Sequence, residues 1–120
     1  MALKVLICDD SIFVRKKMKD AIMNAGVTDI IEASDGQQAV EKYKAEKPDL
    51  CFMDIIMPVK TGVEALKEIR EFDKNAKVIM ASSVGTQANL KEAIVAGAYD
   101  FLQKPIEDSA VKKIIEKITG

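Results

Sequence analysis

The sequence predicts an α/β domain in which five parallel strands form one sheet and five helices cover both of its faces. Short apolar runs alternate with longer segments whose apolar residues recur every three or four positions. No repeat, linker or low-complexity tract interrupts this alternation. Five strands that alternate with five helices indicate a doubly wound parallel sheet, because such sheets are covered on both faces by helices.

The five β-type runs have different apolar character, which indicates their places in the sheet. The first and third are continuously apolar and suit central strands that are buried on both faces. The second contains Glu32 and suits an edge strand. The predicted strands are Lys4 to Cys8, Asp29 to Ala33, Leu50 to Asp54, Val78 to Ala81 and Asp100 to Gln103.

Capping residues mark the ends of the segments with helical spacing. Gly26 and Gly97 each follow an apolar stripe and are expected to end the first and fourth helices. Thr61 and Glu64 have the spacing of a capping box and are expected to open the third. The second and fourth helices are expected to follow Asp35 and Thr86, and the inward residues include Val14, Met18, Ile22, Ala39, Val40, Tyr43, Leu66, Ile69, Leu90, Ala93, Ile94, Val111, Ile114 and Ile115.

Length and composition limit the number of domains and the classes of function. A chain of 120 residues fits one domain, 1–120, and 48% hydrophobic residues can form a core. Eighteen basic and nineteen acidic residues give a net charge of -1, which disfavours nucleic acid as the main partner. No apolar run approaches the roughly 20 residues of a membrane span, and a signal-peptide pattern is missing. We therefore expect a cytoplasmic protein.

The cysteines and the lack of histidine exclude several kinds of catalytic site. Cys8 and Cys51 lie inside apolar runs and are expected to be reduced, buried thiols rather than a disulfide or a metal pair. The sequence contains no histidine, so histidine metal sites and Ser-His-Asp triads are excluded. For the same reason, any histidine that donates a phosphoryl group to this chain must belong to another molecule.

Charged residues follow three of the predicted strands. Asp9 and Asp10 follow the first, Asp54 ends the third and Lys104 follows the fifth. The carboxyl ends of parallel strands form the binding edge of such a sheet, so these side chains can converge. Clustered carboxylates repel one another unless a cation is present, and an all-oxygen site suits Mg²⁺. The pattern therefore predicts phosphoryl chemistry on an aspartate.

Each of these residues also has a simpler explanation when it is considered alone. An Asp-Asp pair after a strand is most often a turn or an anionic helix start. Asp54 can be a satisfied acid at a strand end, because a buried charge needs only a suitable partner. Lys104 can be a solvated surface lysine. Only the joint occurrence at several strand ends favours the site.

The sequence resembles the receiver domains of two-component response regulators over essentially its whole length. This resemblance, and not the apolar pattern, implies a flavodoxin-like or CheY-like sheet with strand order 2-1-3-4-5. It also implies a cis bond before Pro105. The residues that carry the resemblance are Asp9-Asp10, Met53-Asp54-Ile55-Ile56-Met57-Pro58, Gly62, Ser82, Ala96-Gly97-Ala98 and Lys104-Pro105.

The resemblance implies that Asp54 accepts a phosphoryl group from a histidine kinase or a phosphotransfer domain, giving an acyl phosphate. It implies that Mg²⁺ is bound directly by Asp10 and Asp54, through water by Asp9, and by the backbone carbonyl of Ile56. Lys104 and the metal would neutralise charge on the transferred group. Such a protein promotes only its own phosphorylation and dephosphorylation and is not an enzyme for other substrates.

The resemblance also implies a switch and two interaction surfaces. The Ser82 hydroxyl would bond a phosphoryl oxygen, and Phe101, which lacks the tyrosine hydroxyl, would move inward. The alternative for Phe101 is an ordinary core residue. The first helix would dock the phosphodonor through Arg15, Lys16 and Lys17, and the output surface would include Lys91, Glu92, Tyr99, Phe101, Lys112 and Lys113.

Several functions fit such a pocket. The leading prediction is a monomeric, stand-alone response regulator whose target, as in chemotaxis regulators that it resembles, is the flagellar motor switch. The alternative is a phosphorelay intermediate that passes its phosphoryl group to another histidine protein. An aspartate phosphatase is disfavoured because such enzymes have a second acid two residues after the nucleophile, where this sequence has Ile56. A flavin mononucleotide carrier is disfavoured because Asp9-Asp10 repels phosphate.

The side chains of Ile56 and Val84 are expected to flank the water that hydrolyses the acyl phosphate, and neither can hydrogen-bond that water. This predicts slow self-dephosphorylation and dependence on a separate phosphatase or acceptor.

Overall fold

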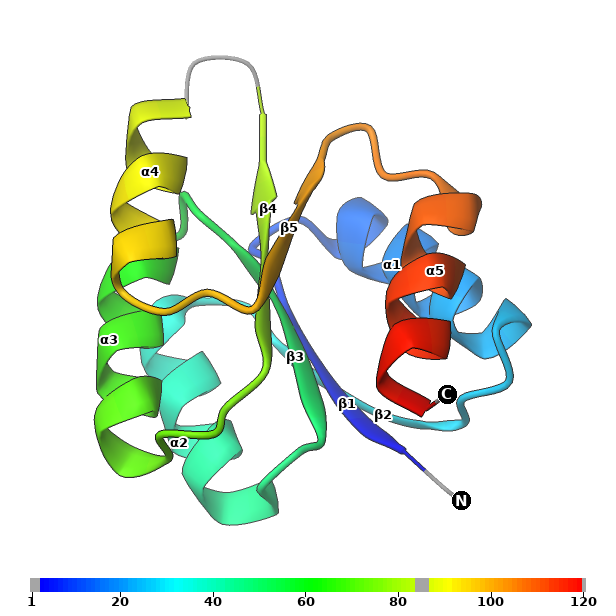
Figure 1. The fold of residues 1–120 in the computed structure, drawn as a ribbon, viewed down its shortest axis with the longest axis horizontal. Helices are drawn as coiled ribbons and strands as arrows, with labels where there is room; N and C mark the ends of the chain where they lie inside the picture. The colour runs from blue at the N-terminus through cyan, green and yellow to red at the C-terminus, as the bar shows by residue number, and fades with distance from the viewer. Residues whose placement is uncertain (1–2, 84–86, 120) are drawn as a thin grey trace.

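Five parallel strands form one central sheet in the order β2-β1-β3-β4-β5 (Figure 1). A computed structural model describes residues 3–83 and 87–119. This order confirms the one that the resemblance implied, and β2 is an edge strand as its Glu32 indicated. β4 is one residue longer than predicted. The strands are β1 (Lys4–Cys8), β2 (Asp29–Ala33), β3 (Leu50–Asp54), β4 (Val78–Ser82) and β5 (Asp100–Gln103).

Helices cover both faces of the sheet and create two separate apolar cores. α1 (Ile12–Asn24) and α5 (Asp108–Thr119) lie on one face, and α2 (Gly36–Glu46), α3 (Gly62–Phe72) and α4 (Gln87–Val95) lie on the other (Figure 1). The first core contains Ile7, Phe52 and Leu102, and the second contains Cys8 and Met53. Because successive strand residues point to opposite faces, β1 and β3 supply both cores.

The helix caps explain where the helices begin and end. The Asp35 side chain accepts a hydrogen bond from the Gln38 N–H at 2.7 Å. Thr61 and Glu64 form the complete capping box that their spacing predicted. Gly26, with φ 98°, follows α1 as predicted, and its conformation favours glycine. Gly97, with φ 102°, follows α4 in the same way, whereas Thr86 lies outside the described residues.

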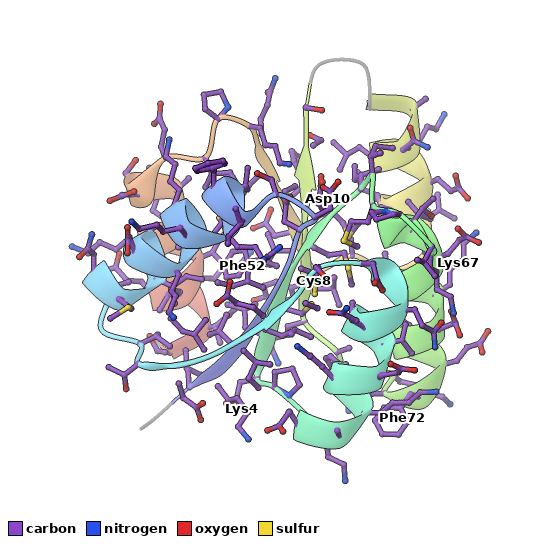
Figure 2. The ribbon with its side chains drawn as sticks, turned by 180° about the vertical axis from the view of Figure 1, so that it is seen from behind. Lys4, Cys8, Asp10, Phe52, Lys67 and Phe72 are labelled. Atoms are coloured by element: carbon purple, nitrogen blue, oxygen red, sulfur yellow. The ribbon has the colours of Figure 1, made fainter. Side chains whose placement is uncertain are left out.

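The two cysteines are free thiols inside the protein (Figure 2 shows Cys8). Their sulfur atoms are 3.7 Å apart. Cys8 pairs in register with Met53, and Cys51 pairs with Leu6, so the cysteines are diagonal neighbours on β1 and β3. Burial raises the pKa of the Cys8 thiol, which opposes thiolate formation. Both cysteines therefore pack as small apolar side chains.

Two apolar residues that were candidates for the core are exposed instead. Ile94 is 52% exposed, so its predicted inward position is wrong, because α4 packs through the fully buried Ala93. Phe101 is 49% exposed on β5, so it is not an ordinary core residue. Among the described residues, no helix is both long enough and apolar enough to cross a membrane.

Candidate functional site

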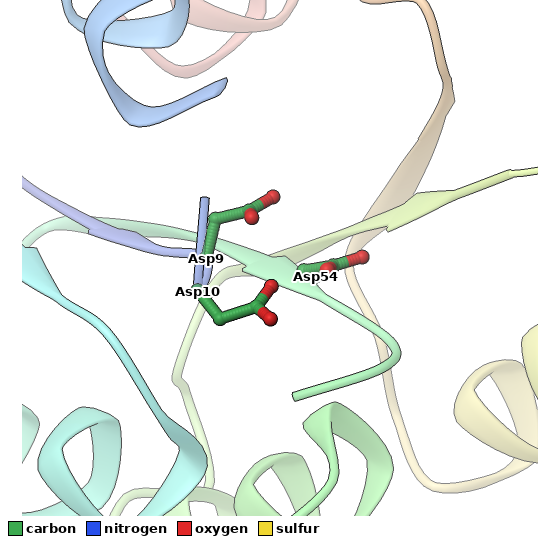
Figure 3. A group of neighbouring side chains, drawn as sticks. All are labelled: Asp9, Asp10 and Asp54. Carbon is green, nitrogen blue, oxygen red and sulfur yellow. The ribbon is translucent and has the colours of Figure 1, made fainter. Parts of the chain in front are cut away.

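Three aspartates lie together at the carboxyl ends of β1 and β3 (Figure 3). Each of Asp9, Asp10 and Asp54 offers a carboxylate oxygen, and these oxygens lie within 4.8 Å of one another. Asp9 is 3% exposed and Asp54 is 9% exposed, whereas Asp10 is open to solvent. The sheet thus brings together the acids that the sequence places 45 positions apart along the chain, from 9 to 54.

Lys104, in the segment that follows β5, contacts two of these acids. Its ammonium nitrogen lies 3.0 Å from Asp9 Oδ2 and 3.2 Å from Asp54 Oδ1. Its backbone N–H donates to the carbonyl of Ser82 at 2.7 Å, which joins the segment after β5 to the end of β4. The Lys104–Pro105 peptide bond is cis, as the resemblance implied. The site therefore contains two buried acids that pair with one partly exposed lysine.

Local hydrogen bonds hold Asp9 in place. Its Oδ1 accepts the backbone N–H of Ser11 at 2.9 Å. Its backbone carbonyl accepts Arg15 Nη1 at 2.7 Å. From the sequence, Arg15 was predicted only to dock the phosphodonor and Ser11 was given no role, although a serine just before a helix is an N-cap signal. The Ser11 side chain indeed accepts the Val14 N–H and begins α1.

The backbone after Asp54 turns tightly against Gly62. The Gly62 N–H donates to the Ile55 carbonyl at 2.8 Å. A Cβ atom built on Gly62 would lie 2.0 Å from the carbonyl oxygen of Asp54, far inside van der Waals contact. Only glycine permits this approach, because a main-chain oxygen cannot rotate away as a flexible side chain can. Gly62 thus fixes the carboxyl end of β3.

Burial and charge pairing have opposite effects on the pKa values of Asp54 and Lys104. Burial raises the pKa of Asp54, and repulsion from Asp9 raises it further, although Lys104 opposes both effects. Burial lowers the pKa of Lys104, but its hydrogen bond to Asp9 and its attraction to Asp54 outweigh this, so the pKa is raised overall. Lys104 is therefore a cation at neutral pH, and ionisation of Asp54 is less favourable in the folded protein than in the unfolded chain.

In metal-free buffer near neutral pH, the Asp54→Asn protein is expected to be more stable than the parent. A raised pKa means that the folded state holds the Asp54 proton more tightly than the unfolded state, so ionisation disfavours folding. This penalty should be complete above the raised pKa and should vanish as the pH falls toward the ordinary value of 3.8. Urea unfolding of both proteins across this range measures the difference.

The exposed Asp20→Asn variant controls for the change of net charge in that experiment. Lower stability of Asp54→Asn at every pH would instead mean that loss of the ion pair with Lys104 costs more free energy than removal of the buried charge recovers.

The other predicted residues lie around this centre. Ser82 is buried at the end of β4. Ile56, two residues beyond Asp54, is 54% exposed in the loop after β3. Val84 lies outside the described residues. The described arrangement therefore contains an acid, a cation and a hydroxyl residue at one edge of the sheet.

The acidic cluster has the composition of a site for a hard divalent cation. Its side-chain donors are carboxylate oxygens only, which are the ligands that Mg²⁺ and Ca²⁺ prefer. Three clustered carboxylates with one lysine retain excess negative charge, and a divalent cation would offset it. The residues present thus fit the metal that the sequence predicted.

A parallel sheet in the order 2-1-3-4-5, with its site at the carboxyl ends of the strands, places the protein in the class of flavodoxin-like, doubly wound α/β domains. Residues 5–116 match the response regulator receiver domain. The chain belongs to this family.

Within the family, the chain is similar to proteins named for chemotaxis. It is 48% identical to the chemotaxis protein CheY of Thermotoga maritima, with 99% of each chain covered. It is 46% identical to that of Bacillus subtilis, with 98% of each covered. A solved CheX–CheY–BeF3–Mg complex from Borrelia burgdorferi matches with a TM-score of 0.90 at 37% identity, covering 98% of this chain and 90% of that one.

Proposed function

We propose that the chain is a stand-alone response regulator of chemotaxis in which Asp54 accepts a phosphoryl group. The observation that carries this proposal is the buried Asp54 carboxylate, paired with Lys104 at 3.2 Å and clustered with two further acids. Such a carboxylate is costly to bury unless its charge is used. The similarity to proteins named CheY supports the chemotaxis role.

The phosphoryl donor in this proposal is a phosphohistidine of a kinase or a phosphotransfer domain. An Asp54 carboxylate oxygen attacks phosphorus, the bond from phosphorus to the histidine nitrogen breaks, and the histidine leaves. The product is an acyl phosphate on Asp54 and a free histidine on the donor. Lys104 lies 3.2 Å from Asp54 Oδ1, close enough to neutralise charge on the transferred oxygens.

Mg²⁺ would be held by Asp10 and Asp54 directly, by Asp9 through water, and by the backbone carbonyl of Ile56. When bound, the metal supplies positive charge for the phosphoryl oxygens. Asp10 is the exposed member of the acidic cluster, so it gives the metal a route from solvent. Asp9 is held by Ser11 and Lys104, which suits a residue that acts through water.

The output of the switch is a change in the surface formed by α4, β5 and α5. The Ser82 hydroxyl would bond the new phosphoryl group, and Phe101 would move inward from its half-exposed position. Phosphorylation favours this state because its contacts form only there. The target proposed for the altered surface is the flagellar motor switch, and the chain would act as a monomer.

The test is an affinity capture from lysate of the source organism. The bait is the protein activated with Mg²⁺ and beryllium fluoride, and an Asp54→Asn protein treated in the same way is the control. The expected result is capture of flagellar switch components by the activated protein only. Capture of histidine phosphotransfer proteins alone, whatever the activation state, would replace the motor role with that of a phosphorelay intermediate.

Mg²⁺ is expected to stabilise the parent protein against unfolding and to lose this effect in Asp10→Asn. A ligand that binds only the folded state adds about 2.7 kcal/mol when present at 100 times its dissociation constant. Asp10 is exposed, so its replacement leaves the core intact. Thermal unfolding with and without Mg²⁺ measures the effect, and Asp20→Asn is the matched control. Equal stabilisation of all three proteins would place the metal elsewhere.

Replacing Ile56 with Asn is expected to shorten the lifetime of the acyl phosphate by about tenfold or more, which is about 1.4 kcal/mol in the barrier. Ile56 is exposed in the loop after Asp54, and its apolar side chain cannot orient water. An amide there can bond the attacking water. The decay of radiolabelled protein gives the lifetime, and Val59→Asn, an exposed change in the same loop, is the control. An unchanged half-life would contradict the prediction.

A further inference from the structure

A basic groove lies beside the acidic site, and the proposed function assigns it no ligand. Two of its residues, Arg15 and Lys16, were predicted from the sequence only to dock the phosphodonor. Its lining residues come from β2, α1 and α2 and from the segment that joins β2 to α2. Figure 2 shows the edge strand β2 between these two helices. Its volume of about 490 Å³ lies within the range of sites for small molecules. The charged and amide side chains that line it are Arg15, Lys16, Lys19, Glu32, Gln38 and Lys42.

The charge of this groove contrasts with the charge of the whole protein. Four cations and one carboxylate line it, so four minus one gives +3, whereas the chain as a whole carries -1. Lys19 lies one turn beyond Arg15 and Lys16 on α1, at spacings of four and three positions, and Lys42 approaches from α2. A concave surface with such an excess of positive charge attracts anions.

The cations are held in place and retain capacity for an anion. Glu32 is shared by Arg15 Nε at 3.0 Å and Lys19 Nζ at 3.9 Å. The Lys42 ammonium donates to the backbone carbonyl of Glu32. Among residues 3–83 and 87–119, Lys16 has no ion-pair partner and is exposed. The Glu32 carboxylate thus pairs with two cations and its backbone carbonyl holds a third, so one negative charge faces four positive ones.

Basic residues also protect edge strands from pairing with other chains, and Lys42 does so at the Glu32 carbonyl. Protection of β2 does not require a hollow that is bordered by cations of both neighbouring helices. Polar groups also lie at its floor, where Gln38 Oε1 accepts the Ser34 backbone N–H at 3.1 Å and the Ser34 hydroxyl at 3.2 Å. The Gln38 amide carries hydrogens that can donate to a ligand.

We propose that this groove binds a small ligand that carries two or more phosphate groups. One phosphate would contact Arg15 and Lys16 on the α1 side, and the next would contact Lys42 on the α2 side. Guanidinium and ammonium groups form charge-assisted hydrogen bonds with phosphate oxygens. The groove also shares Arg15 with the acidic site, through the Asp9 carbonyl at 2.7 Å. Binding does not require Asp54 to be phosphorylated.

The test titrates inorganic pyrophosphate and ADP into the full chain in metal-free buffer, where the acidic cluster repels phosphate. Calorimetry gives the affinity, and backbone amide shifts locate the ligand. The Lys16→Gln/Lys42→Gln variant is expected to weaken both ligands by about tenfold or more, because two charge-assisted contacts are lost. The control, Lys17→Gln/Lys44→Gln, loses the same charge from the same helices outside the groove and should bind within about twofold of the parent.

Adenosine should not bind, since it lacks phosphate, and the largest amide shifts should occur at Lys16, Ser34 and Gln38. Lys16→Gln alone, which leaves the β2 edge untouched, should also weaken binding. Equal weakening by the two double variants would reduce the effect to net charge and overturn the proposal. Shifts confined to Asp10 and Asp54, or binding of a polyglutamate peptide without binding of pyrophosphate, would overturn it as well.

Discussion

Replacing Asp54 with Asn is expected to abolish stable phosphorylation of the protein by a small acyl phosphate or by a phosphohistidine donor. The amide is isosteric with the carboxylate, but it lacks the anionic oxygen that attacks phosphorus. No other described acid combines burial with contact to Lys104 except Asp9, whose oxygens are already held by Ser11 and Lys104. Incorporation of radiolabel, followed by mass spectrometry of the intact chain, measures the loss.

The control for this experiment is Asp20→Asn, which removes an exposed aspartate of α1 and should leave phosphorylation unchanged. Label that persists at the parent level in Asp54→Asn would disprove the assignment of the acceptor. Label that moves to Asp9 would show that a second acid of the site can accept the phosphoryl group when Asp54 is replaced.

Replacing Gly62 with Ala is expected to destabilise the protein by about 3 kcal/mol or more. The added Cβ would lie 2.0 Å from the Asp54 carbonyl oxygen, so the backbone at the end of β3 must shift. The Gly62 hydrogen bond to Ile55 and the position of the acceptor depend on that same turn. Urea unfolding measures the stability loss, and the rate of phosphorylation should fall with it.

Gly26→Ala separates this steric effect from the ordinary cost of replacing glycine. A Cβ atom at Gly26 meets nothing within 4 Å, but its φ of 98° is unfavourable for alanine. We expect a loss of only about 1 kcal/mol there. Equal losses for the two variants would mean that the contact with Asp54 relaxes at little cost.

Local signals were sufficient for most of the fold. The capping box of Thr61 and Glu64 and the continuous apolar run that ends at Asp54 depend on neighbours within a few positions. The periods of helices and strands therefore predicted these elements nearly to the residue. The strand order came from the family resemblance, because apolar periodicity carries no information about which strands are neighbours.

The features that the sequence did not predict arise from contacts between distant segments. Ile94 fits a helical stripe, yet α4 contacts the sheet through Ala93 and leaves Ile94 exposed. The basic groove exists because Lys42 of α2 and Arg15 of α1 meet at Glu32 on the edge strand. Gly62 was named only through the family resemblance, and the physical reason for a glycine there, its close approach to the Asp54 carbonyl, is visible only in the folded chain.

The alternation of side chains along the strands has a consequence for the whole site. Asp9, Asp54 and Lys104 each stand two positions beyond a residue of the same core, namely Ile7, Phe52 and Leu102. These three side chains of the site are thus in phase with one face of the sheet. A single-residue insertion or deletion between Phe52 and Asp54 would shift that phase and turn Asp54 toward the helices on the opposite face of the sheet. A change of two residues would restore the direction of Asp54, so the strands that lead to the site should tolerate paired changes in length better than single ones.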